Sequence, residues 1–447
     1  MKKVYGQSAE EVTNLLRKGQ ITIDLVGIGN MGLPVAVAFA KEGAKVVGVR
    51  KNQTLVDQIN RGDCPLVGEP QIPELLRKMV KSGQLKATTD GAKAASEADA
   101  IIILVPLLVN DFGQEDYSII QNATQQAGRG LEKGNLVITS TTMPPGATER
   151  VIKPILESES GLVAGKDFGL AHSPERLMVG RVMRNLYKFP KIVGGIDNAS
   201  CEAAAGIYGV FGDVVRTSSL IASELVKVAE GTYRDLNISY ANFLAKICEP
   251  LGVDVWEVIA AANKGTSEHC MIHKPGPGVG GHCIPVYPWF LINKAKELDV
   301  NAVLLRQARY INDNMSSHTV DLTIRCLNAH KKSIKASRVG ILGISFRADV
   351  KETRFAPSLK IRNRLLEYQP AAILANDPYF TPKEIVNMGF TPANFDEILS
   401  TDCIIIVTPH KEYKDQIGKL KAAQGRLVDT TNMLPESPWK IGRIPIA

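Results

Sequence analysis

An apolar segment that runs directly into a glycine-rich turn places the strongest constraint on how this chain can fold. Residues 21–34 comprise an apolar run followed by the pattern Gly-x-Gly-x-x-Gly. Helix-forming residues continue over 35–42, and residues 45–49 read as a second strand. A strand, this turn, a helix and a second strand in that order form a dinucleotide-binding unit. The order therefore predicts an α/β domain with a nucleotide site at its first turn.

Each glycine of the turn has a separate physical task. Gly27 makes the tight turn, Gly29 lets the backbone approach a pyrophosphate at the helix N-terminus, and Gly32 lets helix and strand pack closely. We expect the whole turn to bind the cofactor, through Gly27, Ile28, Gly29, Asn30, Met31 and Gly32.

Arg50 follows the second strand, at the place where an acidic residue usually binds the ribose 2′-hydroxyl. An arginine here can contact the 2′-phosphate of NADP or stack on adenine. It can also be a surface residue that leaves NAD binding to the backbone. We expect NAD as the cofactor and count Arg50 among the residues that bind it.

Further apolar runs continue the α/β pattern. Residues 99–106 and 136–142 read as strands buried on both faces, and the second ends in Ser140, Thr141 and Thr142. Ligands lie at the carboxyl ends of parallel strands, so we expect these three hydroxyls to point at the cofactor. A short strand at 168–172 leads to Glu175, a candidate general base.

The middle of the chain is helical, and the α/β pattern then restarts. Helical spacing predicts helices over 220–251, 255–263, 288–297 and 302–328. Strands are predicted at 338–346, 371–375, 403–409 and 425–429, the last of which we take as the final strand. The fold class is α/β, with two Rossmann-like doubly wound parallel-sheet domains joined by a central helical dimerisation domain. The domains are 1–212 for NAD, 213–330 for the helices and 331–447 for a nucleotide sugar.

Residues 274–290 form a Gly/Pro-rich loop that contains Cys283. Glycines let the backbone approach a ligand closely, and a thiol on such a loop is a candidate nucleophile. Taken alone, the loop is equally well explained as a surface turn with an incidental cysteine.

Bulk properties exclude several other classes of protein. The chain has 447 residues and a net charge of +7, with no basic block typical of nucleic-acid binding. It has neither an apolar run of membrane-spanning length nor an apolar signal core, so we expect a cytoplasmic protein. The 7 cysteines include no Cys-x-x-Cys pair. A zinc site at His269, Cys270, His273, His282 and Cys283 would fit no common zinc module, so we expect no metal.

One cofactor, a thiol, a lysine and a carboxylate together indicate a particular reaction. A cysteine becomes useful when an alcohol is oxidised beyond the aldehyde to the acid, because its thioester can be hydrolysed. Lys227, on the helix predicted over 220–251, can stabilise the oxyanions, and Glu175 can activate water.

At this point the sequence resembles the nucleotide-sugar 6-dehydrogenase family, over about residues 20–440. The resemblance is carried by the glycine turn and by Pro144-Pro-Gly146, Ser173-Pro-Glu175-Arg176, Glu224-Leu-Val-Lys227, Tyr233-Arg-Asp-Leu-Asn-Ile238, Gly276-Pro-Gly-Val-Gly-Gly-His-Cys283 and Phe346…Arg354…Pro357. It implies oxidation of the C6 alcohol of a UDP-sugar with two NAD, a UDP-binding C-terminal domain and a homodimer formed through the central helix.

The resemblance also implies roles for individual residues. Cys283 would be the nucleophile, Lys227 the oxyanion-stabilising lysine, Glu175 the acid/base and Thr142 a hydroxyl at the reacting carbon. Arg354 would lie near the cofactor. The substrate-binding set would be Arg234, Gly278, Gly280, Gly281 and Phe346.

The form Gly-Gly-His-Cys is similar to the branch that acts on UDP-N-acetylhexosamines, with UDP-N-acetylmannosamine as the expected substrate. The corresponding N-acetylglucosamine, N-acetylgalactosamine and glucose compounds are alternatives. Tyr287 stands where the family has an aspartate and Gly231 where it has an asparagine. A catalytically impaired UDP-sugar-binding homologue is therefore another alternative. A one-step hydroxyacid dehydrogenase explains neither the cysteine loop nor the C-terminal domain.

Overall fold

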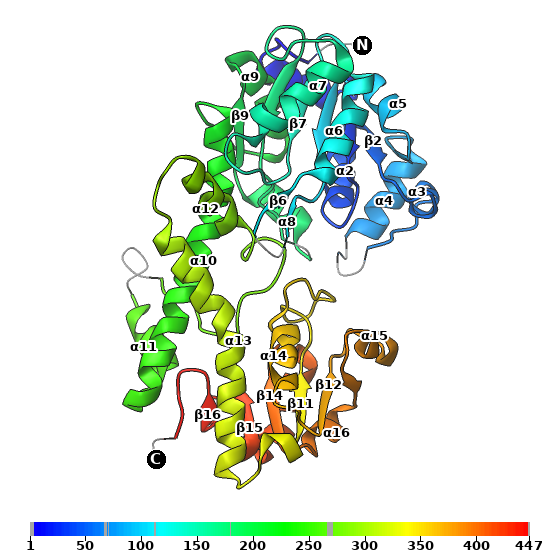
Figure 1. Cartoon of the computed structure of the whole chain (residues 1–447). Coiled ribbons are helices and arrows are strands. Elements are labelled where there is room, and N and C mark those ends of the chain that lie inside the picture. Colours follow the sequence, from blue (N-terminus) through cyan, green and yellow to red (C-terminus); the bar gives the residue numbers. More distant parts are fainter. Residues whose placement is uncertain are drawn as a thin grey trace. The chain divides into compact units, whose positions relative to one another are not determined.

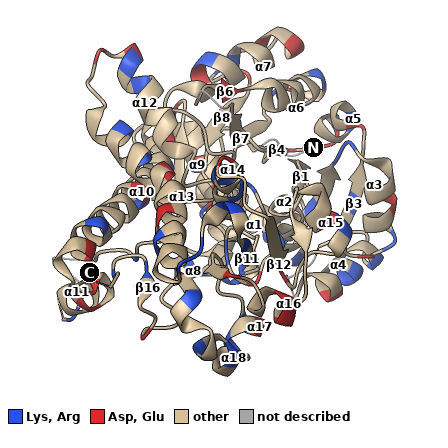
Figure 2. Ribbon diagram, turned by 60° about the horizontal axis from the view of Figure 1, so that its bottom comes forward, with Lys and Arg blue, Asp and Glu red and all other residues tan. Residues whose placement is uncertain are grey.

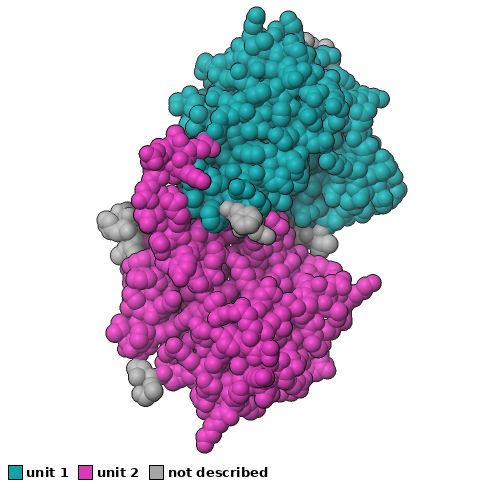
Figure 3. All heavy atoms as spheres, viewed as in Figure 1, with its two compact units in different colours: residues 1–230, 289–294 teal, residues 231–288, 295–447 magenta. Residues whose placement is uncertain are grey.

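The computed structural model describes residues 4–66, 69, 71–110, 113–178, 180–265 and 271–445. The chain divides into two compact units, one of residues 1–230 and 289–294 and the other of residues 231–288 and 295–447 (Figure 3). Each unit contains one large sheet with helices packed on it (Figure 1).

The sheet of the first unit has 8 strands in the order β10-β9-β8-β7-β4-β1-β2-β3. Neighbouring strands are parallel except for β8 and β9, which pair antiparallel. Its strands are β1 (Thr22–Val26), β2 (Lys45–Val49), β3 (Leu85–Thr88), β4 (Ala100–Ile103), β7 (Leu136–Thr139), β8 (Gly169–His172), β9 (Lys191–Gly195) and β10 (Val214–Arg216). Strands β4, β7 and β8 are buried along their whole length, as expected for strands covered on both faces.

Helices cover this sheet, and local sequence signals explain where several begin. Ser8 and Glu11 form a reciprocal capping box at the start of α1, and Pro73 and Pro154 stand in the first turns of α4 and α7. A π-helical turn at Thr148–Ile152 precedes α7. The elements are α1 (Ala9–Arg17), α2 (Gly32–Lys41), α3 (Gln53–Asn60), α4 (Ile72–Lys81), α5 (Gly91–Ser96), α6 (Ser118–Gly130), α7 (Lys153–Ser160), α8 (Val182–Lys188), α9 (Asn198–Tyr208), and a hairpin of β5 (Leu108–Val109) and β6 (Glu115–Asp116).

Two long helices and two shorter ones lie in the chain between the strands of the first sheet and those of the second. They are α10 (Leu220–Leu251), α11 (Val255–Ala262), α12 (Tyr287–Glu297) and α13 (Val303–Ala329). The predicted bounds of α10 are confirmed over all 32 residues, with Pro250 next to its end. Helices α10 and α13 carry most of the polar contacts that hold the cysteine loop, described below.

The sheet of the second unit has 6 strands, all parallel, in the order β13-β12-β11-β14-β15-β16. They are β11 (Arg338–Leu342), β12 (Ala372–Asn376), β13 (Thr391–Pro392), β14 (Cys403–Ile406), β15 (Leu427–Asp429) and β16 (Trp439–Lys440). The remaining helices are α14 (Pro357–Leu366), α15 (Pro382–Asn387), α16 (Phe395–Leu399), α17 (Lys411–Lys414) and α18 (Ile417–Ala422).

The prediction that residues 425–429 form the last strand is wrong, because β16 follows it. This strand is only two residues long and includes Lys440, so the sequence carries no strand signal. Lys440 is nevertheless 1% exposed, because its ammonium donates to Asn432 and to the Pro435 carbonyl and pairs with Asp254 at 2.7 Å.

Basic and acidic residues are spread along many helices and do not gather in one block (Figure 2). None of the helices in the described part of the chain combines the length and apolar character that a bilayer crossing requires.

Candidate active site

The glycine turn has the shape that a dinucleotide site needs. A Cβ on Gly27, whose φ is +108°, would lie 2.2 Å from the Leu104 carbonyl oxygen, and one on Gly32 would lie 2.1 Å from that of Gly27. At Gly29 a Cβ would meet nothing within 4 Å, so the backbone here faces open space. Met31, the N-cap of α2, makes no side-chain cap. Together these features leave room and helix N–H groups for a pyrophosphate, so the residues fit NAD.

Arg50 is attached to this turn. Its Nη1 donates a hydrogen bond of 2.8 Å to the Ile28 carbonyl, and burial lowers the pKa of its guanidinium. The backbone N–H of Arg50 donates to the Thr88 carbonyl of the neighbouring strand. The Nη1 group of Arg50 therefore fixes the middle of the glycine turn at Ile28.

The hydroxyl groups after β7 divide into two kinds. Ser140 hydrogen-bonds the buried Tyr208 hydroxyl at 2.5 Å, and Thr141 donates to the Val105 carbonyl at 2.7 Å. The expectation that Ser140 and Thr141 point at the cofactor is therefore wrong, because both are buried and bonded within the protein. Thr142, the next residue, is half-buried.

Glu175 lies beside Lys191, a residue that the sequence analysis missed. Lys191, at the start of β9, donates from Nζ to Glu175 Oε2 at 3.3 Å, and the two side chains are only 5% and 7% exposed. The other oxygen, Oε1, is buried and has no hydrogen-bond partner in the described chain. A buried carboxylate with one oxygen paired to a cation and the other open is suited to accept a proton.

The loop that carries Glu175 is also tied to α10. Arg176, the next residue, forms an ion pair with Glu230 through Nη2 and Nε. Earlier on the same helix, the fully buried Glu224 accepts N–H groups from Gly146 and Thr148, at 2.5 and 2.8 Å. Burial raises the pKa of Glu224 against the opposing effect of these bonds. Lys227 follows one turn later and is half-buried.

In the second unit, the loop before Cys283 is anchored at several points, and the thiol itself is exposed. The Gly276 N–H donates to Asn242 Oδ1 at 2.9 Å, and the Ser316 hydroxyl donates to the Pro277 carbonyl at 2.8 Å. The Gly281 N–H donates to the Arg354 carbonyl at 2.8 Å. The loop is therefore held by α10, by α13 and by the segment before α14.

Asn242 belongs to a buried polar network between α10 and α13. Its amide donates to Asn312 Oδ1, and Asn312 in turn donates to Asp235 Oδ1 at 2.8 Å. Arg309 pairs with the same oxygen of Asp235 at 2.6 Å, and both side chains are under 5% exposed. These residues were missed because a polar residue inside a helix carries no sequence signal of its partner. The network fixes the acceptor that holds Gly276.

Three of the predicted substrate residues lie on the same loop, and Phe346 packs against it. A Cβ on Gly280 would lie 2.6 Å from Phe346 Cβ, and one on Gly281 would lie 2.9 Å from Phe346 Cε2. Gly278 adopts φ +133°, which favours glycine. Arg354 stacks its guanidinium over Phe355 at 4.3 Å. Arg234, in contrast, is exposed on α10. Burial lowers the pKa of His273, the residue before this loop, and the charge of Arg234 lowers it further.

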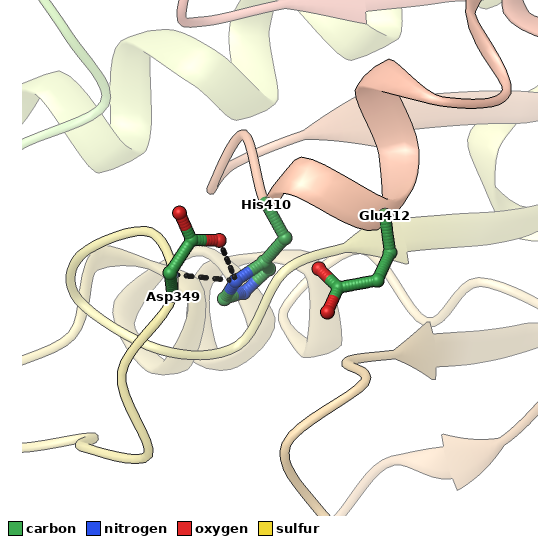
Figure 4. Close-up of side chains that lie close together, drawn as sticks. All are labelled: Asp349, His410 and Glu412. Atoms are coloured by element: carbon green, nitrogen blue, oxygen red, sulfur yellow. Dashed lines mark hydrogen bonds and ion pairs between the residues drawn. The ribbon is translucent and has the colours of Figure 1, made fainter. Parts of the chain in front are cut away.

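One group of potential metal ligands occurs elsewhere in the second unit. Asp349, His410 and Glu412 lie close together (Figure 4). Nδ1 of the buried His410 accepts the Asp349 N–H at 3.0 Å, and Nε2 bonds Asp377 at 3.1 Å. With both ring nitrogens engaged, His410 has no lone pair to offer a metal, and the group serves to hold a loop. For the zinc alternative, His269 and Cys270 lie outside the described residues.

Comparisons with known proteins agree with this arrangement. Three models of the UDP-glucose/GDP-mannose dehydrogenase family match the chain: the NAD binding domain over residues 21–212, the central domain over 221–314 and the UDP binding domain over 340–436.

Individual relatives are similar over nearly the whole chain. A UDP-N-acetyl-D-mannosamine dehydrogenase from Methanococcus maripaludis is 35% identical, covering 94% of each chain. An NDP-N-acetyl-D-galactosaminuronic acid dehydrogenase from Ralstonia nicotianae is 34% identical, covering 95% of this chain and 97% of its own. The solved UDP-D-ManNAc dehydrogenase of Pyrococcus horikoshii superposes with a TM-score of 0.86 at 30% identity, covering 95% of this chain and 99% of its own.

The glycine turn thus occurs in a chain whose two large sheets are parallel except between β8 and β9, and the family models match this chain in all three domain types. The chain belongs to the UDP-glucose/GDP-mannose dehydrogenase family, a family of NAD-dependent oxidoreductases that act on nucleotide sugars.

Proposed function

We propose that the protein oxidises the C6 alcohol of UDP-N-acetyl-D-mannosamine to the carboxylate in two NAD-dependent steps, with Cys283 as the covalent nucleophile. The observation that carries this proposal is the exposed Cys283 thiol on a loop anchored at Gly276, Pro277 and Gly281. A thiol held by a fixed backbone needs little reorganisation to attack a bound aldehyde.

Cys283, Lys227 and Glu175 have separate roles in the proposed reaction. The Cys283 thiolate adds to the aldehyde carbon and forms a thiohemiacetal, while the Lys227 ammonium balances the charge on the oxygen. Oxidation of the thiohemiacetal gives a thioester. Glu175 removes a proton from water as the water attacks the thioester, which releases the carboxylate and the thiol. NAD would be held by residues 27–32 and by Arg50, with Thr142 near it. NAD would accept the hydride in both oxidations.

Each part of the chain has a place in this proposal. Residues 1–212 hold the cofactor, 213–330 carry the lysine helix and the cysteine loop, and 331–447 hold the UDP moiety. Arg234, Gly278, Gly280, Gly281 and Phe346 would contact the substrate, and Arg354 would support the loop at the cofactor. A reactive thiol requires a reducing compartment, so we assign the reaction to the cytoplasm.

A homodimer through α10 is part of the proposal. The helix exposes large apolar side chains at regular intervals, at Tyr233, Tyr240, Phe243, Ile247 and Leu251. The spacing of three, four or seven residues places them along one stripe. A long apolar stripe on a helix surface is typical of an interface between subunits.

UDP-N-acetylgalactosamine is a second candidate substrate. The relative named for the galactosaminuronic acid is 34% identical to this chain, almost the same as the 35% of the mannosamine relative. The two candidate substrates differ only in the configuration of the sugar ring, so the parts of the site that are common to the family do not separate them.

The proposal is tested by supplying purified protein with NAD and, in parallel, the UDP forms of N-acetylmannosamine, N-acetylgalactosamine, N-acetylglucosamine and glucose. We expect about two NADH per sugar and a uronate product, the stoichiometry of the thioester route, with the highest kcat/KM for N-acetylmannosamine. Binding without NADH formation for every sugar would instead identify an impaired homologue.

A further inference from the structure

Gly231 of α10 and Tyr287 at the start of α12 are packed against each other. A Cβ on Gly231 would lie 2.3 Å from Tyr287 Cδ2 and 3.2 Å from its Cε2. Non-bonded carbon atoms optimally lie about 3.5–4.0 Å apart, so the ring occupies the space that any side chain at position 231 would need. Tyr287 is 7% exposed and Gly231 is buried, so the ring is enclosed.

We propose that Gly231 and Tyr287 form one size-matched pair, and that through it Tyr287 acts as a positioning residue for the Cys283 thiol. The proposal rests on the proposed function of Cys283 as nucleophile. It adds the contact that sets the cysteine turn against α10.

Tyr287 is linked to Cys283 through the backbone. The Cys283 carbonyl accepts the N–H of Tyr287 at 2.9 Å and that of Val286 at 3.0 Å. Cys283 and Tyr287 are therefore the two ends of one hydrogen-bonded turn. A shift of the aromatic ring moves this turn, and the thiol moves with it.

The pair complements the anchors described above. Asn242 and Arg354 hold Gly276 and Gly281, which precede the cysteine. The Tyr287 ring holds the residues that follow it. With fixed points on both sides, the short segment around Cys283 has little freedom to move, which is the requirement for an oriented nucleophile.

The same contact joins the cysteine turn to the helix of the proposed catalytic lysine. Lys227 precedes Gly231 by four residues on the continuous α10, and residues four apart share one face of a helix. The close approach of the ring to α10 requires a residue without a side chain, and glycine meets that requirement.

The contact also gives the two departures from the family pattern a single explanation. In the sequence, Gly231 and Tyr287 are two separate departures, from an asparagine and an aspartate. In the structure the two positions touch, and the pair accounts for both as one exchange, in which the larger side chain at 287 fills the space beside the smaller residue at 231. The contact is made by ring carbons, so the pair acts by packing.

A double-mutant cycle with Gly231→Asn, Tyr287→Asp and the double variant tests the proposal. Steady-state kinetics give kcat and the KM for NAD. The rate of Cys283 alkylation by iodoacetamide, followed by peptide mass spectrometry, reports the position of the thiol without cofactor or substrate. Gly231→Ala replaces Gly231→Asn in the cycle if the asparagine variant does not fold.

We expect each single variant to lower kcat about 100-fold, as for a nucleophile displaced by about 1 Å, and to leave the KM for NAD nearly unchanged. The double variant should recover at least about tenfold over the product of the single effects, in kcat and in alkylation rate, as interacting sites do. Tyr287→Phe should retain the wild-type alkylation rate, because it keeps the ring.

Gly418→Ala is the matched control for adding a side chain to a helical glycine. Gly418 lies in α18, and a Cβ there would meet nothing within 4 Å. The Gly418→Ala variant should leave kcat and Cys283 alkylation unchanged.

Additive effects of the two single variants on alkylation and on kcat would overturn the pairing. If the wild type oxidises no UDP-sugar, the proposed function falls, while the alkylation cycle still decides whether the pair positions the thiol.

Discussion

Glu175 and Lys191 form an ion pair in the interior of the first unit, with Nζ 3.3 Å from Oε2 and both side chains almost fully enclosed. The pair brings together the start of the loop after β8 and the beginning of β9. The ammonium of Lys191 offsets the cost of enclosing the carboxylate of the proposed general base.

Replacing Lys191 with Met should damage both stability and activity. The buried carboxylate would lose its cation, which costs about 3–5 kcal/mol of unfolding free energy. Loss of the cation that fixes the Glu175 carboxylate should also lower kcat. Chemical denaturation and steady-state kinetics measure the two effects, and Lys191→Arg should largely restore both.

The matched control is Lys86→Met, which removes an exposed ion pair with Glu97. We expect a loss of unfolding free energy below about 1 kcal/mol and an unaltered kcat. Equal losses for Lys86→Met and Lys191→Met would argue against a special role for the buried pair.

His172 should make the protein less stable in acid. Its ring is buried, and burial lowers its pKa to about 3, while a bond to Thr139 acts in the opposite direction. The unfolded chain takes up this proton near pH 6.5, whereas the folded protein takes it up only near pH 3. Stability should therefore fall as the pH drops from 6.5 towards 3, by up to about 1.4 kcal/mol per pH unit.

Denaturation curves of wild type and His172→Gln between pH 7 and 4 check this. The variant cannot take up the proton, so its stability should fall less steeply with acid. His330→Gln, at an exposed histidine, serves as the control and should keep the wild-type slope. Parallel curves for His172→Gln and wild type would refute the assignment.

Arg50 should support NAD binding through the glycine turn. Loss of its bond to the Ile28 carbonyl in Arg50→Ala should raise the KM for NAD about tenfold with little change in kcat, the effect expected for a charge-assisted hydrogen bond. Arg61→Ala, at an exposed arginine, is the control. A wild-type preference for NADP over NAD would show instead that Arg50 recognises a 2′-phosphate.

The proposed dimer predicts that a charge in the α10 stripe separates the subunits. Phe243→Lys should shift the protein towards monomer, because an ammonium would be buried in an apolar interface. Analytical ultracentrifugation over a range of concentrations measures the shift. Tyr310→Lys, at an exposed aromatic on α13, should leave the association unchanged. A wild-type monomer at all concentrations would exclude the dimer.

Local patterns in the sequence predict much of this fold. The glycine turn fits its predicted role at Gly27, Gly29 and Gly32, and α10 has its predicted bounds, because turn geometry and helical spacing depend on neighbours in the chain. The three-domain division and the residue roles stay predictions.

Contacts between distant residues are what the sequence does not reveal. Lys191 at the start of a strand gives no sign that it meets Glu175, and the two departures at positions 231 and 287 give no sign that they touch. Ser140 and Thr141 read as ligand groups because their burial depends on Tyr208 at the end of α9 and on Val105 in the loop after β4. Tertiary packing determines which of these side chains are buried and which partners they contact.

The central claim is that Cys283 carries the second oxidation, and the product formed by Cys283→Ala tests it most directly. Wild type, Cys283→Ala and the control Cys64→Ala are each incubated with NAD and UDP-N-acetylmannosamine, and the uronate is quantified by mass spectrometry alongside NADH. We predict that uronate formation falls more than about a thousandfold in Cys283→Ala, as when a covalent nucleophile is removed, and persists in Cys64→Ala. Uronate formation by Cys283→Ala at the wild-type rate would contradict the account.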